Sequence, residues 1–487
     1  MRSYDDFEEP QERASKRDRL PRTPPRRREG EWAEELRSGP SKSDRAALPM
    51  RKVIASEIQQ IFRSFGEVHP EEVQKFLDSR RHLMNHVSLT DLLNRLSAAS
   101  LSGMHEPSPD LVTVSTKVLA ELLSERVRPG PREITTAWRA VSSIGIKEPD
   151  MLDELARRTK RVMHAFDTID FAFAITGLVS IARPSPTLQG VLGQTLAMFQ
   201  GFIPASSPDS LLTVLLALRR SGCTAPQLVQ HINASLLEKG DSNLPRLDVL
   251  TLKSMGTLVR CNAELRHDNP SVFSLITDYF YQAFLDGEDG GRVLPGARGA
   301  GDYVWAAAVF GYEVPQELLT ALEKHIHEEI SQLPHPTQRL INSIVAIPAL
   351  LVSSGEPSED CIKRFHDLET MQRSKSADSS FERKVAAVLS EELGLTFEQE
   401  FLLGPYSLDF LVELPGERLV NIETDGDCHH LLRNVATHSQ ETDYRGRDIV
   451  RDKVMQFFGV ETVRVLASEW EAAEDKAQYL KQRLYGA

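Results

Sequence analysis

The sequence predicts a protein of two folded parts, an all-α array of short helices followed by a small α/β domain. Its 487 residues exceed the usual size of a single domain. Apolar residues recur at helical spacing from about Leu48 to Arg373, whereas short alternating runs typical of strands follow residue 380. We expect a disordered tail at 1–46, the helical array at 47–371, a linker at 372–380 and the α/β domain at 381–487.

Composition limits the classes of partner. A formal net charge of -13 argues against a protein that coats nucleic acid over its whole surface, because such binding needs clustered Lys and Arg. Any contact with nucleic acid is therefore expected to be local. The four cysteines form no CxxC pair, so neither a zinc knuckle nor a disulfide framework is indicated. No apolar run approaches the roughly 20 residues that cross a bilayer, and no membrane partner is expected.

The tail mixes Arg-rich runs such as KRDRLPRTPPRRR with acidic runs such as DDFEEP. It has too few apolar residues to offset the entropy cost of ordering, so we expect it to be disordered. Its arginines are typical of an organellar import signal, but Asp5, Asp6, Glu8 and Glu9 interrupt that pattern. An import signal and a solvated polyampholyte tail both remain open.

Within the array, a unit of two amphipathic helices recurs with a period of about 40 residues. The segments TAWRAVSSIGIKEPDMLDELARRT, AITGLVSIARPSPTLQGVLGQTL and VLLALRRSGCTAPQLVQHINASL align Ala140, Gly177 and Ala217, at spacings of 37 and 40 positions. Small residues there would let paired helices approach closely. The period is typical of an α-solenoid, which presents a long concave surface to an extended partner. The Gly-rich stretch 284–302 lacks the spacing of a phosphate loop and is interpreted as an insertion between repeats.

The C-terminal domain is expected to follow the order α-β-β-β-α-β-α. FERKVAAVLSEEL predicts a helix, and TFEQEFLL, YSLDFLVEL and RLVNIETD predict strands. YRGRDIVRDKVMQFFG predicts a helix that ends at Gly459, ETVRVLA a fourth strand, and SEWEAAEDKAQYLKQRLY a last helix capped by Ser468. A helix between the third and fourth strands implies that these two are parallel, while the first three suit an antiparallel meander.

These elements together resemble the RAP domain, a C-terminal RNA-binding module. The most telling residues are Glu423, Asp425, Gly426 and His429 in E-x-D-G-x-x-H, followed by the Glu469–Trp470 pair before the closing helix. The match covers about the last quarter of the chain. The array is similar to the octatricopeptide and heptatricopeptide-like repeats that commonly precede RAP domains.

The resemblance implies an organellar RNA-binding protein, with the mitochondrion favoured and the plastid as the alternative. The expected roles are RNA processing, stability or translation, or a place in the mitochondrial ribosome. The expected partners are single-stranded or ribosomal RNA and the proteins of a ribonucleoprotein.

The order of elements also resembles the restriction-endonuclease-like fold. Nucleases of that fold hold a divalent ion between an acidic residue on one strand and E-x-K on the next. Asp409 matches the first acidic position, Glu423 the second, and Glu382 the helix acid. Mg²⁺ or Mn²⁺ would bind at Asp409, Glu423 and Asp425, because hard cations prefer carboxylate oxygens. Strand alternation places Glu423 and Asp425 on one face of the sheet.

Asp425 stands where such a nuclease has its lysine. A carboxylate there strengthens metal binding but does not stabilise an attacking hydroxide, so His429 or Lys453 would have to take that part. We therefore expect RNA binding with no committed catalytic residue and no required cofactor. A divalent-metal-dependent endoribonuclease is one alternative, and a protein scaffold in a ribonucleoprotein assembly is another.

The Arg-rich helix near residue 450 is expected to supply the one basic edge of an acidic domain. The residues assigned to RNA binding are Arg445, Arg447, Arg451, Lys453, Asp425 and His429. A bland alternative also remains open, in which Asp443 and Arg447 pair four residues apart on a solvated helix edge.

Overall fold

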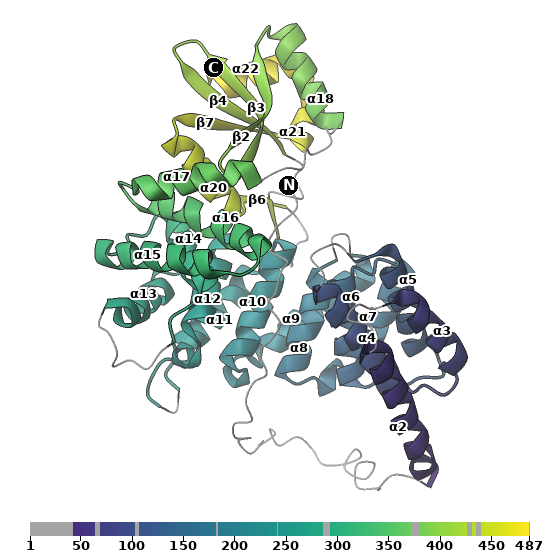
Figure 1. Cartoon of the computed structure of the whole chain (residues 1–487). Helices are drawn as coiled ribbons and strands as arrows, with labels where there is room; N and C mark the ends of the chain where they lie inside the picture. Colours follow the sequence, from purple (N-terminus) through teal and green to yellow (C-terminus); the bar gives the residue numbers. More distant parts are fainter. Residues whose placement is uncertain are drawn as a thin grey trace. The chain divides into compact units, whose positions relative to one another are not determined.

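The structure, a computed structural model, describes residues 42–486 with several gaps. The residues outside it are 1–41, 64–68, 103–106, 182–183, 241, 286–292, 372–379, 426–430, 435–439 and 487. Two compact units divide the chain, one up to Thr195 and one from Leu196 onward, here called the first and second units (Figure 1). Most of the expected tail and nearly all of the expected linker lie outside the described residues.

The first unit is helical. Its helices are α2 (Lys42–Arg63), α3 (Pro70–Arg80), α4 (His86–Ser102), α5 (Pro109–Leu122), α6 (Pro131–Ile144), α7 (Pro149–Val162), α8 (Thr168–Val179) and α9 (Pro186–Gln200), within which the unit boundary falls. Even-numbered helices pack on one another from α2 to α8, and α3, α5 and α7 pack beside them. A Cβ at Gly177 would lie 2.5 Å from the Trp138 carbonyl oxygen, so glycine allows α8 to approach α6 closely.

Alternate helices also pack together in the second unit. Its helices before the α/β domain are α10 (Pro208–Ser221), α11 (Pro226–Leu237), α12 (Leu252–Glu264), α13 (Pro270–Leu285), α14 (Ala297–Phe310), α15 (Gln316–Gln332), α16 (Pro336–Ser353) and α17 (Glu359–Asp367). The successive pairs α10 and α12, α12 and α14, and α14 and α16 are in contact. Gly256 meets Gly299, and Gly301 meets Ala346, at the crossings of α14 with α12 and α16.

The interpretation of 284–302 as an insertion is therefore wrong at both ends. α13 continues to Leu285 and α14 begins at Ala297, and Gly299 and Gly301 serve helix packing instead. α2 likewise begins at Lys42, five residues before the expected start of the array, because Ala46 and Ala47 favour a helix. No helix in the described part of the chain combines the length and apolar character that crossing a bilayer requires.

The C-terminal domain holds a mixed four-stranded sheet. Its elements are α18 (Ser380–Ala387), a π-helical turn (Val388–Glu392), β2 (Phe397–Leu403), β3 (Tyr406–Leu414), β4 (Arg418–Asp425), β5 (Leu431–Asn434), β6 (Gln440–Tyr444), α20 (Gly446–Phe457), β7 (Val460–Leu466), α21 (Ala467–Ala472) and α22 (Lys476–Tyr485). The strand order is β2-β3-β4-β7, with an antiparallel meander from β2 to β4 and a parallel pair of β4 and β7. This order and these pairing directions agree with the predicted sheet, and a mostly helical region precedes a small C-terminal domain with a mixed sheet. The internal repeat and the solenoid remain predictions.

Different helices pack on the two faces of the sheet. Val385 of α18 and Leu480 of α22 pack with Ile422 and Val463 in one apolar core. α20 contacts β7 and also α12, α14 and α16, so it lies between the sheet and the helices of the same unit (Figure 1).

Three details of the α/β domain differ from the prediction. The last helix is broken into α21 and α22, and Asp475, rather than Ser468, caps α22 by accepting from Gln478 N–H at 2.8 Å. Asp443 lies in strand β6, so it cannot form a helical i, i+4 pair with Arg447. The strands β5 and β6 were not expected at all.

The strand β5 belongs to a second small sheet, of order β1-β5-β6, in which β1 (Cys223–Thr224) comes from the helical part of the same unit. β1 and β5 are parallel, with Cys223 opposite Arg433. Arg433 N–H donates to the Gly222 carbonyl oxygen at 2.9 Å, and Arg433 Nη2 donates to Cys223 Sγ at 2.9 Å. Backbone pairing therefore joins the α/β domain to the helices of its unit.

Candidate functional site

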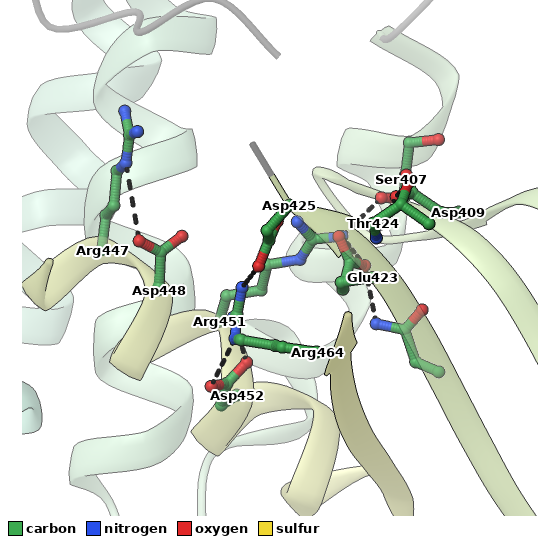
Figure 2. Close-up of polar contacts among 11 residues, drawn as sticks. Ser407, Asp409, Glu423, Thr424, Asp425, Arg447, Asp448, Arg451, Asp452 and Arg464 are labelled. Carbon is green, nitrogen blue, oxygen red and sulfur yellow. Dashed lines mark hydrogen bonds and ion pairs between the residues drawn. The ribbon is translucent and has the colours of Figure 1, made fainter. Parts of the chain in front are cut away.

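Polar residues alternate with apolar ones along β4. Val420 and Ile422 enter the apolar core, whereas Asn421, Glu423 and Asp425 lie on the face that α20 covers, and each is at most 3% exposed. Burying two acidic side chains costs free energy unless partners replace their lost hydration. The partners are two arginines, which Figure 2 shows facing the end of β4.

Arg451 of α20 binds Glu423. Its Nη2 donates to Glu423 Oε1 and, at 2.6 Å, to the Ser407 carbonyl oxygen (Figure 2). Asn421 Nδ2 donates to the same Glu423 oxygen at 2.7 Å. The Arg451 guanidinium also lies over the Tyr406 ring, 5.7 Å from its centroid. Arg451 is 8% exposed, so a residue assigned to a phosphate-binding edge lies inside the protein, and its contact with RNA stays a prediction.

Arg464 of β7 binds Asp425. Its Nη1 donates to Asp425 Oδ2 at 2.7 Å, and its Nη2 donates to Asp452 Oδ1 of α20 at 2.6 Å (Figure 2). The Tyr444 ring lies 4.9 Å from the guanidinium carbon. The position where a nuclease would have lysine thus holds a carboxylate whose neighbouring cation comes from a different strand.

Asp409 of β3 has a separate set of donors. Its Oδ2 accepts from Thr424 N–H at 2.8 Å and from the Thr424 hydroxyl at 2.7 Å, which fastens the end of β4 to β3. Its charge still acts on Glu423. The structure therefore brings Asp409, Glu423 and Asp425 to one end of the sheet, but each carboxylate has a different protein partner.

The pKa of Glu423 lies near neutrality. Burial raises the pKa of the Glu423 carboxyl to about 7, against the opposing charge of Arg451 and with the added repulsion of Asp409. Burial lowers the pKa of Arg451, but the carboxylates of Glu423, Asp409 and Asp448 together outweigh it and raise the pKa overall. Burial also raises the pKa of Asp452, although Arg464 opposes the rise. Glu423 thus changes its charge near neutral pH.

The donor set fits a buried ion-pair network better than a site for Mg²⁺ or Mn²⁺. A divalent ion at Glu423 or Asp425 would have to displace a guanidinium group that already compensates a buried charge. Across the residues that the structure describes, no three His, Cys, Asp or Glu side chains are grouped to hold a metal ion.

Lys453 lies against the helices of its unit. Its Nζ donates to the carbonyl oxygens of Ala308, at 2.5 Å, and Val309, at 3.5 Å, at the C-terminal end of α14. The helix dipole favours a cation at that end. Burial lowers the pKa of Lys453, and the nearby Arg266 guanidinium lowers it further.

Arg445 and Arg447 flank the first residue of α20. Arg447 N–H donates to Glu264 Oε2 of α12 at 3.3 Å. The Arg445 guanidinium takes the space beside Gly222, where an added Cβ would lie 1.8 Å from Nη2. A Cβ on Gly446 would lie 2.8 Å from a backbone oxygen of α12. The start of α20 is therefore closely seated on α10 and α12.

Two predicted residues are not part of the carboxylate cluster. Glu382 lies in the first turn of α18, and that helix packs on the opposite, apolar face of the sheet from Glu423. His429 lies outside the described residues, so its assignment to RNA binding or catalysis stays a prediction.

The sequence interpretation missed Arg464 and Asp452. The signal for Arg464 was present, because an arginine between Val463 and Val465 in an alternating strand must face away from the apolar core. Once the parallel pairing of β4 with β7 is predicted, that arginine is expected beside Glu423 and Asp425. Asp452 carried no comparable signal, since its neighbours on a helix are polar on both sides.

Comparisons with known proteins identify no family. No protein-family model matches the chain, and no curated protein matches its sequence. The geometry of the α/β domain and its sequence motifs are therefore what supports a functional proposal.

Proposed function

We propose that the chain is an RNA-binding protein of an organelle, with the mitochondrion favoured, and that it holds RNA without cleaving it. The observation that carries this proposal is that Glu423 and Asp425 are each bound by a buried arginine, Arg451 and Arg464 respectively. A metal-dependent nuclease needs such carboxylates open to an ion. Here they join β4, β7 and α20 instead.

The RNA part of the proposal draws support from local basic character in an acidic chain. Arg445 and Arg447 lie at the start of α20 and remain partly exposed. The resemblance of the IETDGDCHH and SEWEAAEDKAQYL segments to the RAP domain points the same way. The proposed roles are RNA processing, stability or translation, or a place within the mitochondrial ribosome.

The direct test is binding of a labelled single-stranded organellar transcript to the full chain, measured by fluorescence anisotropy at several salt concentrations. We expect saturable binding that weakens as salt rises, because phosphate contacts release counterions. Absence of binding at low salt would contradict the proposal. It would favour the scaffold alternative, for which co-purification with a defined assembly after nuclease treatment is the test.

A second candidate, a metal-dependent endoribonuclease, has one observation in its favour. Asp409, Glu423 and Asp425 meet at one end of the sheet, and the pKa of Glu423 is about 7. Labelled RNA with Mg²⁺ or Mn²⁺ tests it with the wild type, Asp409→Ala and Glu423→Ala. Glu413→Ala is the matched control, because Glu413 lies on the same strand as Asp409 and is exposed. We expect no cleavage by any of the four proteins. Cleavage by the wild type and Glu413→Ala alone would establish the enzyme.

A further inference from the structure

A cavity of about 520 Å³ is lined by residues of α21 and α22, the helices that follow β7 in the α/β domain (Figure 1). Its volume falls within the range of about 300–1,000 Å³ that is usual for small-molecule sites. We call it the α21–α22 cavity. Its lining combines polar and apolar groups and consists of Glu469, Ala472, Ala473, Tyr479, Gln482 and Arg483.

The walls of the α21–α22 cavity are anchored to the rest of the domain. Trp470 of α21 and Leu480 of α22 are buried in the apolar core. The Trp470 ring meets the Tyr479 ring edge-on, with their centroids 6.3 Å apart. Lys476 Nζ donates to the carbonyl oxygens of Trp470 and Ala473 and so satisfies the C-terminal end of α21. These contacts hold the lining in place without a ligand.

The Glu469 carboxylate has one oxygen occupied and one open. Tyr479 Oη donates to Glu469 Oε2 at 2.8 Å, and Arg483 Nη2 donates to the same oxygen. Burial and the hydrogen bond to Glu469 raise the pKa of Tyr479 to about 12, so its hydroxyl remains a donor at neutral pH. Among the residues that the structure describes, no group donates to Glu469 Oε1. The carboxylate is therefore held in one orientation, with an acceptor left for a ligand.

Donors lie beside this open acceptor. The Arg483 guanidinium lies over the Tyr479 ring, 5.5 Å from its centroid, and offers a planar surface with further N–H groups. The exposed Gln482 side chain precedes it on α22 and supplies an amide donor and acceptor. The side chains of Glu469 and Arg483 are 41% and 42% exposed, so a ligand reaches both from solvent.

We propose that the α21–α22 cavity binds an adenine or cytosine base of single-stranded RNA, with Glu469 and Gln482 as the residues that contact the base edge. Both bases carry an exocyclic amino group next to a ring nitrogen, which places a donor beside an acceptor. Bases of single-stranded RNA are recognised by stacking on aromatic or guanidinium planes and by hydrogen bonds to their edges. The inference rests on the RNA-binding function proposed above and adds the class of base that is selected.

The other two bases fit the open acceptor less well. Guanine presents two neighbouring N–H donors, which require both oxygens of a carboxylate, and Tyr479 and Arg483 already occupy one of the Glu469 oxygens. Uracil presents an N–H group between two carbonyl oxygens, and these repel a carboxylate. Glu469 Oε1 therefore favours an amino group.

The first experiment uses nucleosides, which carry no phosphate. Saturation transfer from the full chain to adenosine and to uridine is measured by NMR for the wild type, Glu469→Ala and Glu461→Ala. Glu461→Ala is the matched control, because Glu461 also forms an exposed ion pair with an arginine of this domain, Arg418. We expect transfer to adenosine in the wild type and the control, and its loss in Glu469→Ala. No transfer to adenosine, equal transfer to uridine, or transfer that Glu469→Ala leaves unchanged overturns the site.

The second experiment measures the anisotropy of labelled oligoadenylate and oligouridylate of equal length with the same proteins. Loss of one charged hydrogen bond should weaken oligoadenylate binding by about tenfold in Glu469→Ala and leave oligouridylate binding close to the wild-type level. The slope of log affinity against log salt should stay the same, because a contact to a base releases no counterions. Equal weakening of both RNAs indicates a structural role for Glu469 and overturns the base contact.

The outcomes separate this inference from the proposed function. RNA binding by the wild type without a base preference, or with a preference that Glu469→Ala retains, overturns the base site and leaves the proposed function standing. Adenosine binding that depends on Glu469, together with no RNA binding by the wild type, overturns the proposed function and the RNA part of the inference. Should Glu469→Ala fail to fold, Gln482→Ala decides in the same way. Its control is Gln478→Ala, because Gln478 is exposed on the same helix and does not line the cavity.

Discussion

The second unit has two buried clusters of carboxylates and arginines, one around Asp302 and one around Glu423. The pKa of the central carboxyl group is lowered in the first cluster and raised in the second. Around Asp302, burial raises the pKa, but Arg260, Arg298 and Arg219 outweigh it and the pKa falls below its ordinary value. Around Glu423, burial raises the pKa to about 7, because Arg451 opposes the rise only in part and Asp409 and Asp425 add to it.

The difference shows that burial alone does not determine the charge state of these acids. Asp302 and Glu423 are 2% and 3% exposed, so the balance of neighbouring charges is what separates them. Three arginines act on Asp302, whereas Glu423 is opposed by Arg451 and lies close to Asp409 and Asp425. α20 connects the two, since it contributes Arg447 beside one and Arg451 beside the other.

The largest expected effect is that of Asp302→Asn. It removes the buried carboxylate that Arg260 and Arg298 share and leaves the buried Arg260 with less compensating charge, so we expect a loss of about 3–5 kcal/mol in the free energy of unfolding at pH 7. Urea denaturation measures it. Asp360→Asn is the control, because Asp360 pairs with Arg364 at the surface and should cost at most about 1 kcal/mol. Similar losses of unfolding free energy in Asp302→Asn and Asp360→Asn would show that the buried carboxylate stabilises the protein no more than the surface one does.

Glu423→Gln should raise the free energy of unfolding relative to the wild type as pH rises, whereas Asp302→Asn lowers it. The folded-state pKa of about 7 lies above the ordinary glutamate value of 4.5, so the folded protein binds the proton more tightly and loses stability as pH rises from about 4.5 to 7. The amide has no such loss. Relative to the wild type, the variant should gain up to about 3 kcal/mol between pH 4.5 and 8, measured by urea denaturation across that range.

Asp302 provides the contrast in the same titration. The pKa of Asp302 is lowered in the folded state. Its contribution to the free energy of unfolding is therefore fully present above its unfolded-state pKa of about 3.8 and is lost as pH falls through its folded-state pKa. A Glu423→Gln variant whose stability follows the wild type in parallel over pH 4.5–8 would show that the two clusters do not differ in this way.

A smaller effect is expected from Gly446→Ala, which tests the seating of α20 between the clusters. The new Cβ would lie 2.8 Å from the Ala263 carbonyl oxygen and from Trp305, and overpacking of this kind costs about 1–3 kcal/mol. Gly190→Ala in α9 is the control, because nothing lies within 4 Å of its Cβ and alanine favours a helix. Thermal melts of both variants make the comparison, and equal stability would mean that α20 is seated loosely.

The smallest effect concerns the aromatic rings that both clusters place over an arginine. The Cζ atom of Arg260 lies 4.8 Å from the centroid of the Trp305 ring, and the Cζ atom of Arg464 lies 4.9 Å from the centroid of the Tyr444 ring. Tyr444→Leu should reduce the free energy of unfolding by about 1 kcal/mol through loss of the cation–π contact. Tyr485→Leu, at an exposed position, serves as the control in the same urea denaturation and should be near neutral.

Most of the α/β fold could be predicted because its strands carry their pattern locally. The alternation in YSLDFLVEL and RLVNIETD determined β3 and β4, and the intervening helix determined the parallel pairing with β7. β5 and β6 could not be found in this way. β5 pairs with β1, and its Arg433 bonds to Cys223 from 210 positions away, which no local window contains.

The candidate site was predictable only in part, for a similar reason. That Glu423 and Asp425 share a face follows from the two-residue period of a strand. Their partners Arg451 and Arg464 come from two other elements, and the choice between metal and guanidinium as counter-charge depends on their packing. The sequence interpretation identified the acidic side of the network, but it assigned Arg451 to RNA binding and overlooked Arg464. RNA binding itself stays a prediction that the experiments above address.

The pairing of β1 with β5 has a consequence for a chain cut in two. Noncovalent contacts from Arg433, Arg447 and Lys453 join the α/β domain to helices that precede it in sequence. A fragment ending at Met371 and another beginning at Ser380 would therefore complement each other when co-expressed and elute as a single species. Loss of the covalent connection would leave the unit assembled, much as two subunits remain joined by their interface.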